Sequence, residues 1–368
     1  RCNAHNRLQG KASLVEESAV KIVVTGNEGY IGSVMTEQLL EMGHEIIGVD
    51  CGYFPKNQKW GIVGPRETLH QISKDIRDVR EEDIRGAEAI VHLGALSNDP
   101  MGELDPDQTM QINHVATTRL AKLAKKMGVG RFIFASSCSV YGAREAEILR
   151  EESEPIPITW YAKSKVNAER DLLALADHSF ATVVLRNATA YGVSPSMRLD
   201  LVVNNLVACA YATGRILLLS DGTAWRPQVH IRDIGVAVEK CLEAPVEVIS
   251  GQTFNVGENS ENCTVREIAT MVKEAFPGSK LEFDPKGGKD ARSYRVDFSK
   301  IRNRLRFTPI WSVRKGIEEI RDALSREVFG EEEFKNARFY RVRYLKHLLD
   351  NGSLGQDLRW KTEGPDLK

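Results

Sequence analysis

The sequence predicts an α/β fold in which a doubly wound, Rossmann-type parallel sheet is joined to a smaller, mixed α/β substrate domain. Runs of apolar and β-branched residues alternate with helical patterns through the first half of the chain. A glycine-rich turn follows the first of these runs, and beyond about residue 194 the pattern becomes less regular. Strands that alternate with helices are typical of a parallel sheet covered by helices on both faces.

Short apolar runs predict the strands of this sheet, and longer patterns with helical spacing predict the helices. The predicted strands span residues 21–25, 45–50, 69–74, 89–93, 131–136 and 181–187. The predicted helices span residues 31–42, 107–126 and 161–176. Farther along, the run FYRVRYLKHLL at 339–349 predicts an amphipathic helix that packs on the chain or on a partner, rather than one with a catalytic role.

Composition limits the classes of function. The chain has 368 residues, 42% of them hydrophobic and 27% charged, with a formal net charge of −1. This balance indicates neither nucleic acid nor an acidic membrane as a partner. No apolar run approaches the roughly 20 residues that a membrane span needs. The first residues, RCNAHNRLQG, lack the apolar core of a secretory signal, and we expect residues 1–20 to form a flexible leader.

The six cysteines are scattered along the chain, at Cys2, Cys51, Cys138, Cys209, Cys241 and Cys263. Because no C-x-x-C pair occurs, their spacing predicts neither a zinc site nor a dense disulfide framework. We therefore expect no bound metal and a location in the reducing cytoplasm.

Residues 25–32 (TGNEGYIG) predict a dinucleotide-binding turn. Gly26 allows the tight turn after the strand, Gly29 lets a pyrophosphate approach the backbone, and Gly32 lets the helix pack on the strand. The helix that starts near Tyr30 and Ile31 points its N-terminus at the phosphates. The strand before this turn and the helix after it distinguish it from an ordinary surface turn.

Asp50 ends the second predicted strand. A carboxylate at this place accepts hydrogen bonds from the adenosine ribose and repels a 2′-phosphate. The residues that follow, Cys51, Gly52 and Tyr53, include no arginine or lysine. The sequence therefore favours NAD over NADP as the cofactor.

Tyr161 and Lys165 are four residues apart, which places them on one face of a predicted helix. An ammonium group beside a phenol lowers the phenol pKa from its usual value of about 10, so that Tyr161 can exchange protons near neutrality. The same lysine can reach the nicotinamide ribose. The fifth predicted strand ends in ASSCSVYG at 135–142, and a serine there faces the ligand crevice and can hold the reacting substrate oxygen.

These residues resemble the extended short-chain dehydrogenase/reductases, in the nucleotide-sugar epimerase/dehydratase branch that includes the UDP-glucose 4-epimerases. The resemblance runs from about residue 21 to residue 323. Its ordered matches are the glycine motif at 25–32, Asp75-Ile76, His92-Leu93-Gly94-Ala95, Asn113, Ser137, Tyr161-x-x-x-Lys165 and the segment with Arg226 and His230.

The resemblance implies a role for each matched residue. It implies that Ser137, Tyr161 and Lys165 form a triad in which Tyr161 takes a sugar hydroxyl proton while NAD+ takes hydride from the same carbon. The implied cofactor-binding residues are Gly26, Gly29, Tyr30, Ile31, Gly32, Asp50, Asp75, Ile76, Leu93, Gly94, Ala95, Asn113, Tyr161 and Lys165. The implied substrate-binding residues are Ser97, Thr189, Asn204, Asn205, Arg226 and Arg292. Among them Arg226 is expected to bind the nucleotide diphosphate, since a guanidinium group matches phosphate geometry.

The resemblance also implies a domain organisation and a partner. Residues 21–193 with 230–257 are expected to form the NAD-binding domain, and residues 194–229 with 258–329 the nucleotide-sugar-binding domain. Residues 330–368 are expected to form a helical C-terminal tail. The helices at 107–126 and 161–176 are expected to form the interface of a homodimer.

Two departures from the family pattern affect the predicted reaction. Thr189 stands where the epimerases often carry an asparagine, and Ser137-Cys138-Ser139 stands where 4,6-dehydratases carry Thr-Asp-Glu. The second departure removes the acid and base that expel water in an ordinary dehydratase. Cys138 is either a small packing residue or a thiol that replaces the missing acid after a lowering of its pKa.

Four hypotheses about function follow. The first is a nucleotide-sugar epimerase that acts through a transient 4-keto sugar. The second is a 4-ketoreductase that consumes NADH, and the third is an unusual dehydratase that uses Cys138. The fourth, a non-catalytic NAD-binding protein, leaves the set of Ser137, Tyr161 and Lys165 without a purpose.

Overall fold

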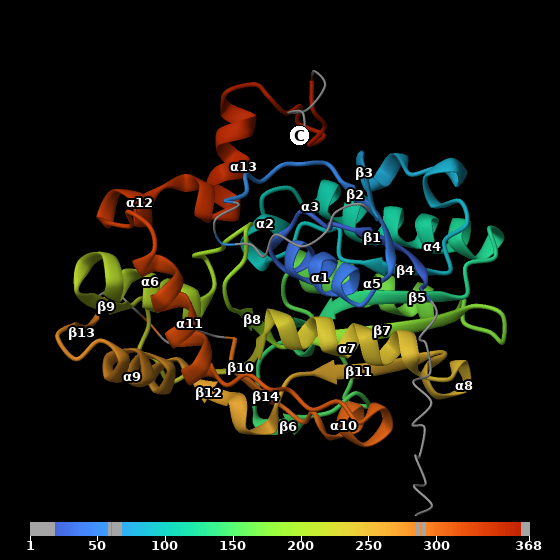
Figure 1. The fold of residues 1–368 in the computed structure, drawn as a ribbon. Coiled ribbons are helices and arrows are strands. Elements are labelled where there is room, and N and C mark those ends of the chain that lie inside the picture. Colours follow the sequence, from blue (N-terminus) through green and yellow to red (C-terminus); the bar gives the residue numbers. More distant parts are fainter. Residues whose placement is uncertain (1–18, 58–59, 61–67, 285–287, 289–291, 362–368) are drawn as a thin grey trace, which may run out of the picture.

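A computed structural model describes residues 19–57, 60, 68–284, 288 and 292–361. Its central feature is a seven-stranded, wholly parallel sheet in the order β11-β7-β5-β4-β1-β2-β3 (Figure 1). The strands are β1 (Lys21–Thr25), β2 (Glu45–Asp50), β3 (Leu69–Ser73), β4 (Ala89–His92), β5 (Arg131–Ser137), β7 (Ala181–Asn187) and β11 (Gln252–Val256). The predicted doubly wound α/β fold is confirmed. Six of the strands match the predicted runs, and the sequence analysis missed β11.

The chain winds away from β1 in both directions. It passes first to β2 and β3 on one side and then returns to β4 on the other side of β1. The change of direction opens a crevice at the carboxyl ends of β1 and β4, and open parallel sheets bind their ligands at such a place. The residues that directly follow these two strands therefore line the candidate site.

Successive residues of β1 face opposite sides of the sheet and are buried on both. Ile22 and Val24 belong to one apolar core, and Val23 belongs to another. Helices α1 (Tyr30–Glu41) and α7 (Ile231–Glu243) pack together on the first side, whereas α4 (Thr117–Lys126) and α5 (Trp160–Leu173) pack on the second. Burial on both faces explains why the strands are continuous apolar runs rather than alternating ones.

The helix predicted over 107–126 is interrupted. Helix α3 (Pro106–Met110) passes into a π-helical segment, η4 (Gln111–Ala116), before α4 begins. Within η4 the Asn113 side chain is hydrogen-bonded to the backbone of Leu96. The hydroxyl of Thr117, the first residue after η4, donates to the carbonyl of Asn113 (2.8 Å). The Thr117 hydroxyl bond, to a carbonyl four residues earlier, competes with the backbone hydrogen bonds of a regular α-helix.

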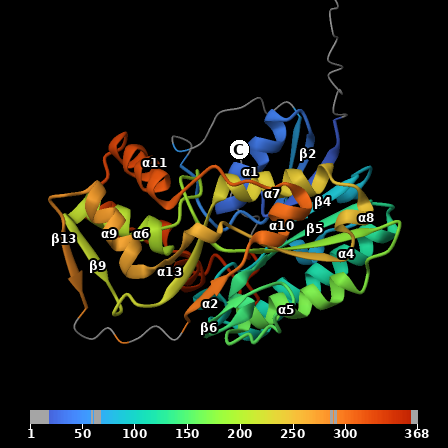
Figure 2. The same cartoon turned by 90° about the horizontal axis from the view of Figure 1, so that it is seen from below.

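A second core lies apart from the sheet, and its elements gather on one side in Figure 2. It is formed mainly by α6 (Val202–Thr213), β9 (Arg215–Leu218), α9 (Val265–Ala275), β13 (Lys280–Phe283) and α11 (Val313–Ser325). A three-stranded sheet, β12-β10-β8, connects it to the larger part through β8 (Thr189–Tyr191), β10 (Trp225–His230) and β12 (Asn262–Thr264). The two-domain division of the sequence analysis remains a prediction, which these separate cores support.

Shorter elements complete the fold. They are η2 (Ile76–Asp78), η3 (Glu81–Ile84), α2 (Asp99–Gly102), η5 (Cys138–Tyr141), β6 (Arg144–Leu149), α8 (Val246–Ile249), η6 (Asn259–Glu261), β14 (Tyr294–Val296) and α10 (Ser299–Leu305). The parallel pair β6 and β14 lies beside the main sheet as a sheet of its own.

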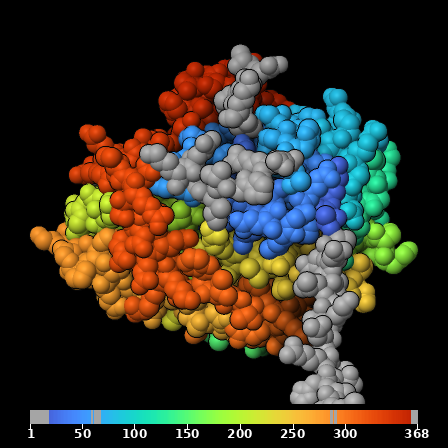
Figure 3. All heavy atoms as spheres, in the orientation of Figure 1, coloured from blue at the N-terminus to red at the C-terminus, as the bar shows by residue number. Residues whose placement is uncertain are grey.

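The C-terminal segment contains α12 (Glu331–Lys335), η7 (Ala337–Phe339) and α13 (Arg341–Asp350). Leu345 and Leu348 of α13 are buried in a core that includes Tyr53 and Ile76 of the sheet loops. Figure 3 shows the red C-terminal residues along the upper left of the molecule, above the yellow and green elements. Of the predicted leader, residues 1–18 lie outside the described residues.

Candidate active site

The glycine turn after β1 is packed too closely for side chains. Gly26 has a φ of +71°, and a Cβ there would lie 2.7 Å from the backbone nitrogen of Gly94, in the loop after β4. A Cβ on Gly32 would lie 2.0 Å from the carbonyl oxygen of Gly26. The turn can therefore hold α1 against the sheet with its N-terminus at the crevice, which is the arrangement that binds a pyrophosphate.

Asp50 ends β2 beside this turn. Its Oδ2 accepts a hydrogen bond from the backbone nitrogen of Glu28 (3.1 Å), and its Oδ1 accepts one from Gly52 (2.8 Å). Burial raises the pKa of Asp50, and these backbone hydrogen bonds act in the opposite direction. Each carboxylate oxygen retains the capacity to accept a second hydrogen bond, which fits the ribose of a dinucleotide.

The loops after β3 and β4 form the next wall of the cavity. Asp75 caps η2 by accepting from the backbone nitrogen of Arg77 (2.8 Å), and Ile76 packs beside it. The remaining predicted contacts in this wall, Leu93, Gly94 and Ala95, also line the cavity. Asn113 does not line it, because its amide is bonded to Leu96 and to the Ser164 hydroxyl (3.1 Å) and so holds the β4 loop to α5.

Tyr161 and Ser137 meet at the opposite wall. Tyr161 lies in the first turn of α5, whose N-cap Thr159 accepts a hydrogen bond from Ala162. Ser137 ends β5, and both Ser137 and Tyr161 line the cavity. Burial, together with the nearby Asp99 carboxylate, raises the pKa of Tyr161 to about 12, against the lowering effect of the Ser137 hydrogen bond.

Lys165 lies one turn farther along α5. Its Nζ donates to the carbonyl oxygen of Ala135 (2.8 Å) and lies 5.8 Å from the Tyr161 ring centroid. Burial lowers the pKa of Lys165 to about 7, while the Glu169 carboxylate acts in the opposite direction. The expected approach of the Tyr161 pKa to neutrality is not seen, because desolvation of the phenol outweighs the groups that favour its charged form.

Cys138 is fully buried and does not line the cavity. Its thiol donates to the carbonyl oxygen of Arg186 (3.1 Å), and burial raises its pKa. This environment fits a packing residue rather than an acid with a pKa near neutrality. All five cysteines in the described part of the chain are free, and Cys2 lies outside it.

The predicted substrate residues divide into two groups. Ser97, Thr189, Asn205, Arg226 and Arg292 line the cavity. Arg226 on β10 lies 5.9 Å from the centroid of the Tyr294 ring, and Arg292 Nη1 is 2.9 Å from Asp99 Oδ2.

Asn204 is fully buried and does not line the cavity. Its amide donates to the Tyr30 hydroxyl (2.9 Å) and to the Arg198 carbonyl, and accepts from the Gly192 nitrogen. It thus ties the start of α1 to the loop before α6. Gly29, Tyr30 and Ile31 line the cavity, and their binding of the cofactor remains a prediction.

Sequence reasoning missed two arginines of the same cavity, Arg198 and Arg341. Arg198 is bonded to Asp200 through Nε (2.9 Å) and Nη2 (3.0 Å) and donates to the Ser97 hydroxyl (3.3 Å). Neither arginine follows a predicted strand or belongs to a recognised motif. Only their burial in the folded chain distinguishes them from surface arginines.

The cavity that these residues line has a volume of about 1250 Å³. Ligand pockets commonly measure about 300–1,000 Å³, so this one can hold a dinucleotide and a second ligand together. Within the described ranges no cluster of three or more histidine, cysteine or acidic side chains could hold a metal ion. No helix in the same ranges combines the length and apolar character that a membrane crossing requires.

The parallel sheet, the glycine turn, Asp50 and the Tyr161–Lys165 helix together define an NAD-binding enzyme. The chain belongs to the NAD-dependent epimerase/dehydratase family, whose model matches residues 22–257. The predicted family membership and the predicted NAD cofactor are thereby confirmed.

Individual relatives are nucleotide-sugar enzymes. UDP-glucuronic acid decarboxylase 1 of Arabidopsis thaliana is 29% identical over 331 residues, which cover 86% of this chain and 72% of the relative. UDP-glucose 4-epimerase of Bacillus subtilis is 26% identical over 324 residues, which cover 81% of this chain and 94% of the relative. The solved structure of MoeE5 with UDP-glucose and NAD superposes with a TM-score of 0.72 at 26% identity, covering 83% of this chain and 99% of that one.

Proposed function

We propose that this enzyme is a nucleotide-sugar epimerase that acts through a transient 4-keto sugar, with Tyr161 as the acid and base. The placement of Ser137 and Tyr161 together in the lining of the cavity carries this proposal. Cys138 and Ser139 follow Ser137, so this loop contains no carboxylate that could expel water. An epimerase needs only one proton-transferring group at this position.

NAD supplies the oxidation of the sugar carbon and its reversal. The chain holds the reacting hydroxyl between Ser137 and Tyr161, and Tyr161 accepts its proton and later returns it. The ammonium form of Lys165 favours the phenolate by its charge, against the burial that raises the pKa of Tyr161 to about 12. Arg226 would bind the substrate diphosphate through its guanidinium group. UDP-sugars are the first substrates to examine, since the names of the relatives specify UDP-glucose and UDP-glucuronic acid.

The mass of the product distinguishes the possible reactions. The enzyme is incubated with UDP-, GDP-, CDP- and dTDP-hexoses and with UDP-glucuronic acid, without added NADH. An unchanged mass with inverted configuration supports epimerisation. Loss of water or of carbon dioxide contradicts it, and so does a conversion that requires a 4-keto sugar and stoichiometric NADH.

Two variants test the assigned groups. Tyr161→Phe should lower turnover by about 10²–10⁴-fold while leaving NAD binding largely intact. Cys138→Ala should retain turnover, because the thiol is buried outside the cavity lining. A large loss of turnover in a folded, NAD-binding Cys138→Ala protein would support the dehydratase instead.

The assembly and location of the enzyme are further parts of the proposal. A homodimer through η4, α4 and α5 is supported by Val115, an apolar side chain that is 46% exposed on this surface. Light scattering on the wild type and on Val115→Glu tests the interface, since a monomeric wild type contradicts it. A cytoplasmic location is supported by the free thiols and can be tested by fractionating cells.

A further inference from the structure

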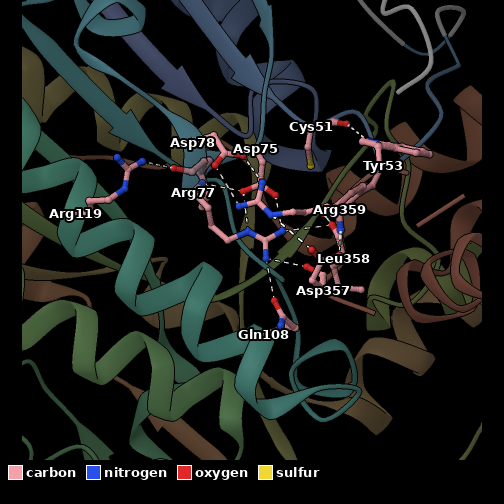
Figure 4. A network of polar contacts seen from close by, with 12 residues as sticks. Cys51, Tyr53, Asp75, Arg77, Asp78, Gln108, Arg119, Asp357, Leu358 and Arg359 are labelled. Carbon is pink, nitrogen blue, oxygen red and sulfur yellow. Dashed lines mark hydrogen bonds and ion pairs between the residues drawn. The ribbon is translucent and has the colours of Figure 1, made fainter. Parts of the chain in front are cut away.

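The C-terminal segment 331–361 forms part of the wall of the cavity. Residues 334–335 and 340–343 line the cavity directly. Farther along, the segment is hydrogen-bonded to the loops after β2 and β3 in the pairs Tyr53–Leu358 and Arg77–Asp357 (Figure 4). A third hydrogen bond joins Trp360 to the carbonyl of Cys51. The segment is therefore anchored to the two loops that are expected to bind the adenosine.

Apolar packing fixes the same segment. Leu345, Leu348, Leu354 and Leu358 are buried in a core with residues of the sheet loops and of η4. Each fully buried leucine contributes about 1.5–3 kcal/mol. The first residue of α13, Arg341, consequently has a fixed position beside the cavity.

Arg341 is a buried cation with unused hydrogen-bonding capacity. Its side chain is 2% exposed and its Cζ lies 4.2 Å from the centroid of the Phe54 ring. Nη2 donates to the carbonyl oxygen (2.6 Å) and to the hydroxyl (2.8 Å) of Ser196. Nη1 is also buried, but it has no hydrogen-bond partner among the described residues.

Among the residues that the structure describes, no carboxylate forms an ion pair with Arg341. The neighbouring Asp200 is hydrogen-bonded to Arg198 instead. Burial and the charge of Arg198 lower the pKa of Arg341 to about 9. A buried guanidinium with an unpaired NH group is costly unless an anion binds to it.

The position of Arg341 indicates which of the two expected ligands, NAD or the nucleotide-sugar, it would contact. Arg341 is hydrogen-bonded to Ser196, and the Ser194 hydroxyl, two residues earlier, donates to the carbonyl of Tyr30 at the start of α1 (2.7 Å). Arg226, on β10, lies beside Tyr294 instead. Of these two arginines, Arg341 is therefore the one near the predicted pyrophosphate site at the start of α1.

We propose that Arg341, carried by the C-terminal segment, binds the pyrophosphate of NAD and that this segment retains the cofactor in the site. A planar guanidinium group with two donor nitrogens suits phosphate oxygens. The segment packs across the loops at residues 51–54 and 75–78, so NAD held by Arg341 would leave only after this segment moves.

Calorimetry with three ligands tests the contact. Arg341→Met removes the charge and keeps an unbranched apolar side chain, and Lys346→Met removes a charge from an exposed position of the same helix. Arg341→Met should weaken NAD binding by about 10- to 100-fold, while binding of adenosine and of uridine diphosphate stays within about twofold of wild type. Lys346→Met should bind all three like wild type.

Thermal unfolding distinguishes binding from a structural role. Without NAD, the midpoint temperature of unfolding of Arg341→Met should equal or exceed that of wild type, because an unpaired buried charge is removed. Addition of NAD should raise this midpoint less in Arg341→Met than in wild type. The proposal is overturned if uridine diphosphate binding falls and NAD binding does not. It is equally overturned if NAD affinity is unchanged, or if the ligand-free midpoint falls and all three ligands weaken together.

Discussion

Removal of one partner of the buried ion pair next to Lys165 should destabilise the protein strongly. Arg186 of β7 and Glu169 of α5 have side chains that are 6% and 4% exposed, with 2.7 Å between Nη2 and Oε2. Arg186 Nε also donates to both Glu169 oxygens (3.2 and 3.1 Å), and its Nη1 donates to the Tyr141 hydroxyl (3.0 Å). The pair joins the sheet to the helix that carries Tyr161 and Lys165.

Glu169→Gln leaves the Arg186 guanidinium buried without a counter-charge. Removing one partner of such a pair costs about 3–5 kcal/mol, a large part of the roughly 5–15 kcal/mol that stabilises a typical protein. The double variant Glu169→Leu/Arg186→Met should lose less than either corresponding single variant, because no unpaired charge remains. Since Glu169 raises the pKa of Lys165, Glu169→Gln should also lower that pKa below about 7.

Urea unfolding measures these effects, provided that the slope of free energy against urea is unchanged. Glu331→Gln is the control, since Glu331 forms an exposed pair with Lys335 on α12 and its loss should have no measurable effect. A loss below about 1 kcal/mol for Glu169→Gln would refute the reasoning, because a buried charge cannot lose its partner so cheaply. A double variant less stable than both singles would refute it as well.

Three further predictions follow from the cofactor site and the sheet. Calorimetry should show that the enzyme binds NAD(H) more tightly than NADP(H), because the Asp50 carboxylate repels a 2′-phosphate. The opposite preference would contradict the assignment of Asp50 to the ribose. Gly26→Ala should lose NAD affinity and at least about 1–2 kcal/mol of stability. The control Gly43→Ala, at a φ of +86° but in open space, should keep its NAD affinity. Equal NAD binding by both variants would contradict the packing argument. Burial and, to a smaller extent, the charge of Lys165 lower the pKa of His92 from 6.5 to about 3. Between pH 6.5 and about pH 3 the His92 imidazole is therefore protonated only in the unfolded chain, so the free energy of unfolding should fall as the pH falls. Urea titrations of His92→Gln should show a slope in that range reduced by up to about 1.4 kcal/mol per pH unit, and an unchanged slope would contradict the assignment.

Much of the nucleotide-binding half could be predicted because its signals are local. The strand–turn–helix around Gly26 and Gly32 depends on backbone conformation and close packing within a few residues. The pair Tyr161 and Lys165 depends only on helical spacing. Such features are encoded where they occur, and the sequence by itself determined the fold class, the glycine turn and the candidate triad.

Only the tertiary structure decided what each side chain contacts. Cys138 and Asn204 lie next to cavity residues in sequence, yet neither of their side chains lines the cavity. The Asn113 side chain, on the helix predicted over 107–126, likewise contacts the backbone of Leu96 in the loop after β4. Adjacent residues on an element point in different directions, so sequence proximity does not determine which of them reaches a ligand.

The C-terminal segment illustrates the same limit over a longer distance. Its charge pattern predicted an amphipathic helix, and α13 is such a helix, but nothing local indicates that Arg341 reaches Ser196 or that Leu358 meets Tyr53. The sequence determined that this segment has an apolar face. The surface that the face covers depends on contacts between residues about 145 and 305 positions apart, and these exist only once the sheet and its loops have assembled.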